Sequence, residues 1–359
     1  MLNKKLSEII LALLLFGMLT SSINPSIALT MYETIYIRAD GTIEPDGAPI
    51  STSDYVTYVL TDDILSYAMD YGVVVERDNV IIDGKGYEVH ALGFYGVYLN
   101  GVSNVTIKNM RIKANFYGVC LDGSSNNTII WNSITNAVRG IYLINSLNNT
   151  IIENNITNNL ENVFLDCSSN NTIIRNNMTN GVFGVVLKDE SNNNTIIENK
   201  IANNNSTGIS VEFSKYNVVF GNNITNNKAN GMLLSCAANN NTIYYNWFVD
   251  NAVNRTKEGK PQVETSNSLN FWDNGTIGNY WNDHKSSDEN GDGICEDPYV
   301  ISSRKRTGEL EQADHFPIWA AELQQPPLSM SIELIVAAVI IVVAVVGVAV
   351  FIIRKKKEA

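Results

Sequence analysis

Residues 127–144 read NTIIWNSITNAVRGIYLI, and this pattern recurs along the middle of the chain. Its Asn-Thr-Ile-Ile motif stands at 127–130, 149–152, 171–174 and 194–197. A repeat of 22–24 residues indicates a solenoid, because one unit of this size buries its apolar side only by stacking on its neighbours. The position of the motif threonine continues in both directions, as Thr106, Thr128, Thr150, Thr172, Thr195, Val218 and Thr242.

Each unit contains three apolar patches of three or four residues, rich in β-branched side chains and separated by Asn, Ser and Gly. Such patches are typical of short strands, and no window shows the 3.6-residue stripe of a helix. Three strands per coil, repeated in register, predict parallel pairing of each strand with its copy one coil away. We therefore expect an all-β fold, with a parallel β-helix over residues 72–270. A leucine-rich horseshoe is excluded because its helical half-repeat is missing.

One position of the repeat is asparagine in six successive coils. Asparagine side chains stacked at a turn can hydrogen-bond along the solenoid axis and can satisfy the backbone groups of the turn. We interpret these residues as a structural ladder in preference to a binding site. They are Asn132, Asn154, Asn176, Asn199, Asn222 and Asn246.

Both ends of the chain carry apolar segments. Two N-terminal lysines, the apolar run 9–19 and a small-residue site predict a signal peptide over 1–28, with an uncleaved anchor as the alternative. Residues 334–353 are uncharged and match the ~20 residues that span a bilayer. The four cations that follow predict a cytoplasmic tail, 354–359. We expect a single-pass protein of the cell membrane with its β-helix outside and a C-terminal transmembrane helix.

The remaining segments are predicted as an N-terminal cap (29–71), a closing module (271–320) and a linker (321–333). The chain has 37 acidic and 25 basic residues, a formal net charge of −12, so nucleic acid is excluded as a partner. Dense Asn-x-Thr sequons predict a glycoprotein, although an Asn-Asn-Thr repeat generates such sequons by itself.

Three of the four cysteines occupy positions that the repeat keeps apart. Cys167 and Cys236 are equivalent positions three coils apart, and Cys120 lies two coils before Cys167. These separations of about 10–14 Å exceed the ~7 Å that a disulfide spans between Cα atoms. We expect these three cysteines to be unbridged and buried or half-buried; the partner of Cys295 stays open.

An acidic loop in the closing module is the candidate metal site. Asp288, Asn290 and Asp292 stand at positions 1, 3 and 5, with glycine at position 6, as in the first half of a calcium loop. Position 12 is tyrosine instead of glutamate, so Asp297 is the candidate for a late carboxylate. Ca²⁺ is thus the one cofactor that we consider, with a solvated acidic turn as the alternative.

Only weak catalytic candidates emerge from the repeat. Asp122 and Asp166 share a register two coils apart, about 10 Å, at the outer limit for the acid pair of an inverting glycosidase. Other residue types occupy the same register in the neighbouring coils. Solvated carboxylates are therefore the preferred interpretation, and the chain is not assigned as an enzyme on these residues.

The repeat and its flanking segments resemble the NosD-like β-helix family, within the group of carbohydrate-binding proteins and sugar hydrolases. The motifs Phe271-Trp-Asp-Asn-Gly, Gly278-Asn-Tyr-Trp-Asn-Asp and Ala313-Asp-His-Phe-Pro look like the family's closing module. The start, Ile35-Tyr-Ile-Arg-Ala-Asp-Gly, looks like that of archaeal exported members. The resemblance implies a right-handed β-helix. Copper-site maturation, the function behind the family name, is not carried over because soft ligands are missing, and the pectin-cleaving motifs of relatives are absent.

Our leading hypothesis is a surface protein that recognises glycans or other envelope components, including envelope proteins, without turning them over. The first alternative is a carbohydrate-active enzyme, a polysaccharide lyase or a hydrolase. The second is an accessory factor for copper-site maturation of an exported metalloenzyme, similar to the protein that names the family.

Overall fold

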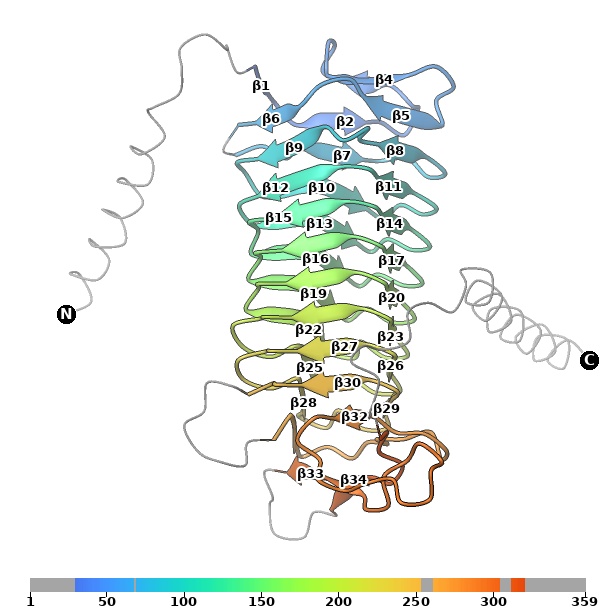
Figure 1. Ribbon diagram of the computed structural model, residues 1–359. Coiled ribbons are helices and arrows are strands. Elements are labelled where there is room, and N and C mark those ends of the chain that lie inside the picture. The colour runs from blue at the N-terminus through green and yellow to red at the C-terminus, as the bar shows by residue number, and fades with distance from the viewer. Residues whose placement is uncertain (1–29, 68, 253–260, 304–310, 320–359) are drawn as a thin grey trace, which may run out of the picture. The chain divides into compact units, whose positions relative to one another are not determined.

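The computed structural model describes residues 30–67, 69–252, 261–303 and 311–319 (Figure 1). These residues form strands and turns. The predicted signal peptide, linker, transmembrane helix and tail lie outside the described ranges. Within those ranges, the structure has no helix of the length and apolar character that crossing a membrane requires.

Three sheets run along the solenoid, and each coil contributes one strand to each of them (Figure 1). Sheet A consists, in order, of β1 (Met31–Tyr32), β6 (Ile64–Ser66), β9 (Glu88–Ala91), β12 (Arg111–Ala114), β15 (Ser133–Thr135), β18 (Asn155–Thr157), β21 (Asn177–Thr179), β24 (Lys200–Ala202), β27 (Asn223–Thr225), β30 (Trp247–Val249) and β32 (Tyr280–Trp281). Sheet B consists of β3 (Ile43–Glu44), β2 (Ile35–Ile37), β7 (Val73–Val75), β10 (Tyr95–Asn100), β13 (Tyr117–Asp122), β16 (Arg139–Ile144), β19 (Glu161–Asp166), β22 (Phe183–Lys188), β25 (Ile209–Glu212), β28 (Met232–Ser235), β31 (Val263–Ser266), β33 (Tyr299–Ser303) and β34 (Gln312–Asp314). Sheet C consists of β4 (Ile50–Thr52), β5 (Thr57–Leu60), β8 (Ile81–Asp83), β11 (Thr106–Lys108), β14 (Thr128–Ile130), β17 (Thr150–Ile152), β20 (Thr172–Ile174), β23 (Thr195–Ile197), β26 (Val218–Phe220) and β29 (Thr242–Tyr244).

The pairing between coils is parallel and keeps the register of the sequence repeat. Thr106 pairs with Thr128, Thr128 with Thr150, and Thr150 with Thr172. The prediction of an all-β parallel solenoid with three strands per coil is therefore confirmed. Residues 29–71, predicted as a cap, contribute strands too, because β2, β5 and β6 pair in parallel with β7, β8 and β9.

The core is a set of columns of identical or similar side chains that point inward from the three sheets. Ile129, Ile151 and Ile173 from sheet C are fully buried, as are Ile134 and Ile156 from sheet A. Each such side chain stabilises the fold by roughly 1.5–3 kcal/mol through burial. No single coil could bury these side chains alone, so the core exists only in the stack.

Buried asparagines connect the coils at the turn between sheets C and A. Asn132 donates from its backbone N and its Nδ2 to Oδ1 of Asn154, at 2.9 and 3.1 Å. Asn154 bonds in the same way to Asn176, at 2.9 and 3.0 Å. Asn199, Asn222 and Asn246 continue the series. These hydrogen bonds give partners to turn amides that water cannot reach.

The structure contains further ladders that the sequence analysis missed. One follows the turn between sheets B and C through Asn127, Asn149, Asn171, Asn194, Asn217 and Asn241. Side chains of the closing module end these ladders. In the first ladder, Asn246 donates to Asn279, whose backbone N donates to Asp314. In the second, Asn241 donates to Asn270, whose backbone N donates to Gln312. The closing module thus supplies the partners that a further coil would have supplied.

Candidate functional site

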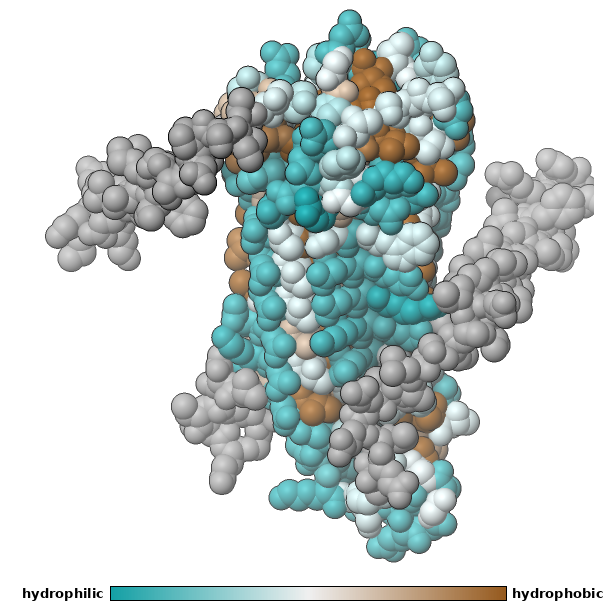
Figure 2. Space-filling model, turned by 45° about the horizontal axis from the view of Figure 1, so that its top comes forward, coloured by the Kyte–Doolittle hydropathy of each residue, from teal (hydrophilic) through white to brown (hydrophobic). Residues whose placement is uncertain are grey.

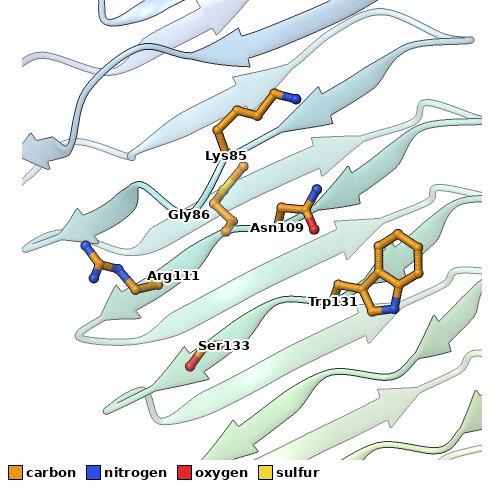
Figure 3. A pocket seen from close by; sticks show the side chains of 7 residues that line it. Lys85, Gly86, Asn109, Arg111, Trp131 and Ser133 are labelled. Atoms are coloured by element: carbon orange, nitrogen blue, oxygen red, sulfur yellow. The ribbon is translucent and has the colours of Figure 1, made fainter.

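A shallow groove of about 480 Å³ lies at the corner between sheets C and A (Figure 3). Three successive coils line it, because each coil turns the same corner between its sheet C strand and its sheet A strand. The turn after β8 contributes Lys85 and Gly86, the next coil Asn109, Met110 and Arg111, and the third coil Trp131 and Ser133. The groove therefore combines one aromatic ring, two cations and two uncharged polar side chains.

Trp131 is an aromatic side chain that stands out into solvent. It occupies the single residue between β14 and the ladder residue Asn132, with a positive φ of 58°, and is 55% exposed. This left-handed conformation is costly for most residues, and the buried hydrogen bonds of the ladder compensate for it. The equivalent turn residues of the next coils, Glu153 and Arg175, have φ of 52°. The fold therefore projects the side chain at this corner outward, whatever the residue type.

A chain of ionic contacts holds the indole of Trp131 in place. Its Nε1 donates to Oε2 of Glu153 at 2.7 Å. Glu153 in turn contacts Arg175 at 3.3 Å, and Arg175 contacts Glu198 at 3.3 Å. The ring is thus oriented before any ligand arrives, which reduces the entropy lost on binding.

Asp83 lies under the groove and is almost fully buried. Burial by itself raises the pKa of Asp83, but donation from Asn109 Nδ2 and from the backbone N of Lys85, together with the charge of Lys108, outweighs burial and lowers the pKa. Its ion pairs to Lys85 and Lys108 measure 3.3 and 3.5 Å. Asp83 therefore acts as a buried, ionised anchor for the two turns that form one wall of the groove.

The outer face of sheet B places the two weak catalytic candidates in matching surroundings. Asp122 ends β13 and Asp166 ends β19, with Ile144 between them in the register. Tyr98 donates its hydroxyl to Asp122, and Tyr142 donates to Asp166, both at 3.3 Å. One intervening strand keeps the two carboxylates about 10 Å apart by strand spacing. The structure therefore does not bring them together into a close pair.

A cation lies over the aromatic side chains of the same face. The guanidinium of Arg139 lies 4.3 Å from the ring centroid of Tyr142 and 3.9 Å from that of Phe164, and it pairs with Glu161 at 2.7 Å. Tyr142 and Phe164 are only 8% and 5% exposed. Around Tyr142 and Phe164 this face is consequently a packed aromatic layer on the outside of the sheet, and these two rings offer little open surface.

The acidic loop forms a compact turn around Asp288. Its carboxylate accepts hydrogen bonds from the backbone N–H groups of Gly291, Asp292 and Gly293. Asn290 Oδ1 accepts from the backbone of Asp292. Asp297 lies on the far side of the loop, where its backbone N donates to Ser286 Oγ. In the described ranges, no group of three or more His, Cys, Asp and Glu side chains has the arrangement of a metal site.

The cysteines are spread over different elements. All four are unbridged; Cys120 and Cys295 are buried and Cys236 is half-buried. The predicted burial of Cys167 is wrong, because this residue is exposed. It follows β19 at a turn with a positive φ of 48°, which directs the side chain away from the core.

Comparisons with solved structures find proteins of similar fold. The A-module of the mannuronan C-5 epimerase AlgE6 from Azotobacter vinelandii matches with a TM-score of 0.53 at 14% identity, covering 70% of this chain and 78% of that chain. The Dettilon tailspike protein gp208 matches with a TM-score of 0.47 at 16% identity, covering 67% and 60%. DFA-IIIase from Arthrobacter chlorophenolicus A6, solved with DFA-III, matches with a TM-score of 0.46 at 13% identity, covering 59% and 57%. At these identities the likeness establishes the fold alone.

A search of curated protein sequences found no match. The sequence model of the family described as "Periplasmic copper-binding protein (NosD)" matches residues 34–205 and 78–286. Within the described ranges the histidines do not come together as copper ligands, because His90 lies in β9, His284 contacts the carbonyl of Asp297, and His315 contacts Asp273. The family match spans most of the solenoid, and the parallel β-helix of this structure agrees with it. The chain therefore belongs to the NosD family of right-handed parallel β-helices.

Proposed function

We propose that this protein recognises glycans at a cell surface without turning them over. The observation that carries the proposal is the groove beside Trp131, where an exposed and pre-oriented indole lies among polar side chains. Sugar rings pack their C–H faces on aromatic rings, and their hydroxyl groups need hydrogen-bond partners such as Asn109 and Ser133. Figure 2 shows a mostly hydrophilic surface along the coils, with apolar patches near the end where the first strands lie.

The proposal is tested by titrating the full-length chain, purified in detergent, against a panel of soluble polysaccharides by calorimetry. Trp131→Ala is expected to weaken binding by about tenfold, as loss of a stacking contact does. Tyr216→Ala is the matched control, because Tyr216 is 56% exposed with a positive φ of 60° at a turn before sheet C. Equal affinity of wild type and Trp131→Ala for every bound polysaccharide would contradict the assignment of the groove.

Display on the cell membrane is part of the proposal. It rests on the apolar segment 334–353, the cations that follow it and the signal-like N-terminus, all in the sequence. Protease added to intact cells is expected to remove the β-helix and to leave the C-terminal tail protected. A solenoid that resists the protease until the cells are lysed would overturn this orientation.

A carbohydrate-active enzyme is the second candidate. The observation that favours it is the pair of Tyr–Asp contacts on sheet B, at Asp122 and Asp166. Release of oligosaccharides by the wild type that disappears in both Asp122→Ala and Asp166→Ala would support an enzyme. Binding without release supports recognition alone.

A further inference from the structure

We infer that the groove beside Trp131 prefers sugars that carry an acid group, either a carboxylate or a sulfate ester, over neutral sugars. This inference rests on the proposed recognition of glycans at the same groove, and it names the class of glycan. The feature behind it is the arrangement of charge around the groove, which differs from that of the chain as a whole.

The side chains that line the groove include two cations and no carboxylate. Lys85 and Arg111 come from neighbouring coils, and each is more than half exposed. Arg111 lies 3.6 Å from Asp63 and 4.0 Å from Glu88. At these distances neither carboxylate takes a hydrogen bond from the guanidinium, so its planar fork of N–H donors can still match the two oxygens of an acid group.

Two carboxylates near the groove, Asp83 and Glu88, pair with Lys108 and Lys113, which do not line it. Asp83 is buried and pairs with Lys108 as well as with Lys85. Glu88 is held by Lys113 at 3.0 Å. Counted with Arg111, Asp63 and Glu153, these residues are four cations and four anions, on a chain whose formal net charge is −12. An acidic glycan is therefore repelled less at this corner than by the chain as a whole, and the exposed N–H donors of Arg111 can bind its acid group.

The aromatic ring and the cations are placed for one ligand. Trp131 lies one coil beyond Asn109 in the same turn column, and Ser133 lies one coil beyond Arg111 in β15. Arg111 extends toward Glu88 and Asp63 in the preceding coils, and the Trp131 indole extends toward Glu153 in the following coil. Because adjacent coils are about 4.8 Å apart, a ligand that contacts both groups is an oligosaccharide, with one sugar unit on the indole and the acid group of another at the guanidinium. Glu153 carries a negative charge beside Trp131, but it is engaged by the indole N–H and by Arg175.

The experiment compares polymers that differ in charge and not in backbone. The full-length chain in detergent is titrated with polygalacturonate and with its methyl ester, and with dextran sulfate and dextran, at low and high salt. Tighter binding of either charged polymer than of its neutral partner is expected, by about tenfold at low salt and much less near 1 M salt, where the screening length is about 3 Å. The two arms distinguish carboxylate from sulfate.

Variants connect the preference to the groove. Arg111→Gln and Lys85→Gln are each expected to lower the affinity for the charged polymer and to reduce its preference over the neutral polymer by about threefold. Lys215→Gln removes an exposed cation before sheet C and is expected to change neither. A thermal unfolding curve of each variant shows whether it is folded. If Lys85→Gln lowers stability because Asp83 loses its ion pair, Arg111→Gln still tests the charge preference.

The outcomes separate the inference from the proposed function. If neutral and charged polymers bind equally, with Trp131→Ala still harmful, the charge preference is refuted and glycan recognition stands. If the charge preference persists in the double variant of Lys85 and Arg111, the groove is not its source and the inference is refuted. If no polysaccharide binds the wild type, the proposed function and the inferred charge preference are both refuted.

Discussion

Replacing Asn176 by alanine tests whether the asparagine ladder stabilises the solenoid. The Asn176 side chain takes part in five hydrogen bonds: Oδ1 accepts from N and Nδ2 of Asn154, and Nδ2 donates to the carbonyls of Ile151 and Ile174 and to Oδ1 of Asn199. The side chain is 1% exposed, so water cannot replace these partners without opening the turn.

The expected loss follows from those contacts. A buried hydrogen bond contributes about 1 kcal/mol net, and a buried N–H without a partner costs about 1–3 kcal/mol. Asn176→Ala leaves the backbone N–H of Asn154 without its acceptor at 2.9 Å. We therefore expect the free energy of unfolding to fall by about 3–5 kcal/mol.

The measurement is urea denaturation at equilibrium, followed by circular dichroism and by tryptophan fluorescence. Two probes are needed because a weakened coil can uncouple the two ends of a solenoid. Asn155→Ala is the matched control: its side chain is exposed, and its Oδ1 accepts a hydrogen bond from Asn177. We expect less than about 1 kcal/mol for this control. Equal effects of the two substitutions would refute the ladder as a source of stability.

Three other predictions follow from particular contacts. Gly118→Ala places a Cβ 2.4 Å from the carbonyl oxygen of Gly140 and is expected to lower stability by about 2–3 kcal/mol, measured by thermal unfolding. Burial raises the pKa of Asp314 to about 6, so the folded chain keeps a proton that the unfolded chain has lost above pH 4. Stability should therefore fall by about 2 kcal/mol as pH rises from 4 to 6, and Asp314→Asn should flatten that profile. Calcium binding at Asp288 would raise the melting temperature by a few degrees at millimolar Ca²⁺, and no shift on addition of calcium or chelator would dismiss the site.

The closing module gives the acidic and polar residues at the end of the chain a structural role. Asp314 accepts hydrogen bonds from Asn279 and from Trp281 Nε1, the latter at 2.9 Å, and is fully buried. Trp281 stacks between Phe248 and Tyr299, with ring centroids 4.5 and 4.1 Å away. The module therefore ends both the polar ladder and the apolar core, which would otherwise present an open edge for further coils.

The candidate groove shows what the sequence analysis overlooked. Trp131 precedes a ladder asparagine, and the equivalent positions of the following coils are Glu153 and Arg175. Aligning the coils would have shown two aromatic residues, Trp131 and Tyr245, in an otherwise non-aromatic turn column. The candidates drawn from the sequence were acids and metal ligands, and Trp131 was not among them. The catalytic candidates, Asp122 and Asp166, lie on sheet B and do not line the groove.

The repeat is sufficient to predict the parallel solenoid, its register and the first asparagine ladder. It could do so because every contact in these features joins residues one period apart, such as Thr128 and Thr150. Only the folded structure shows which side chains line the groove and which contact one another at the end of the stack. Lys85, Arg111 and Trp131 line one groove because three successive coils turn the same corner. Asp314 accepts a hydrogen bond from Asn279, 35 residues earlier in the chain. The contact between Asp314 and Asn279 does not follow the period of the repeat, so only the path of the chain after the last coils brings these two residues together.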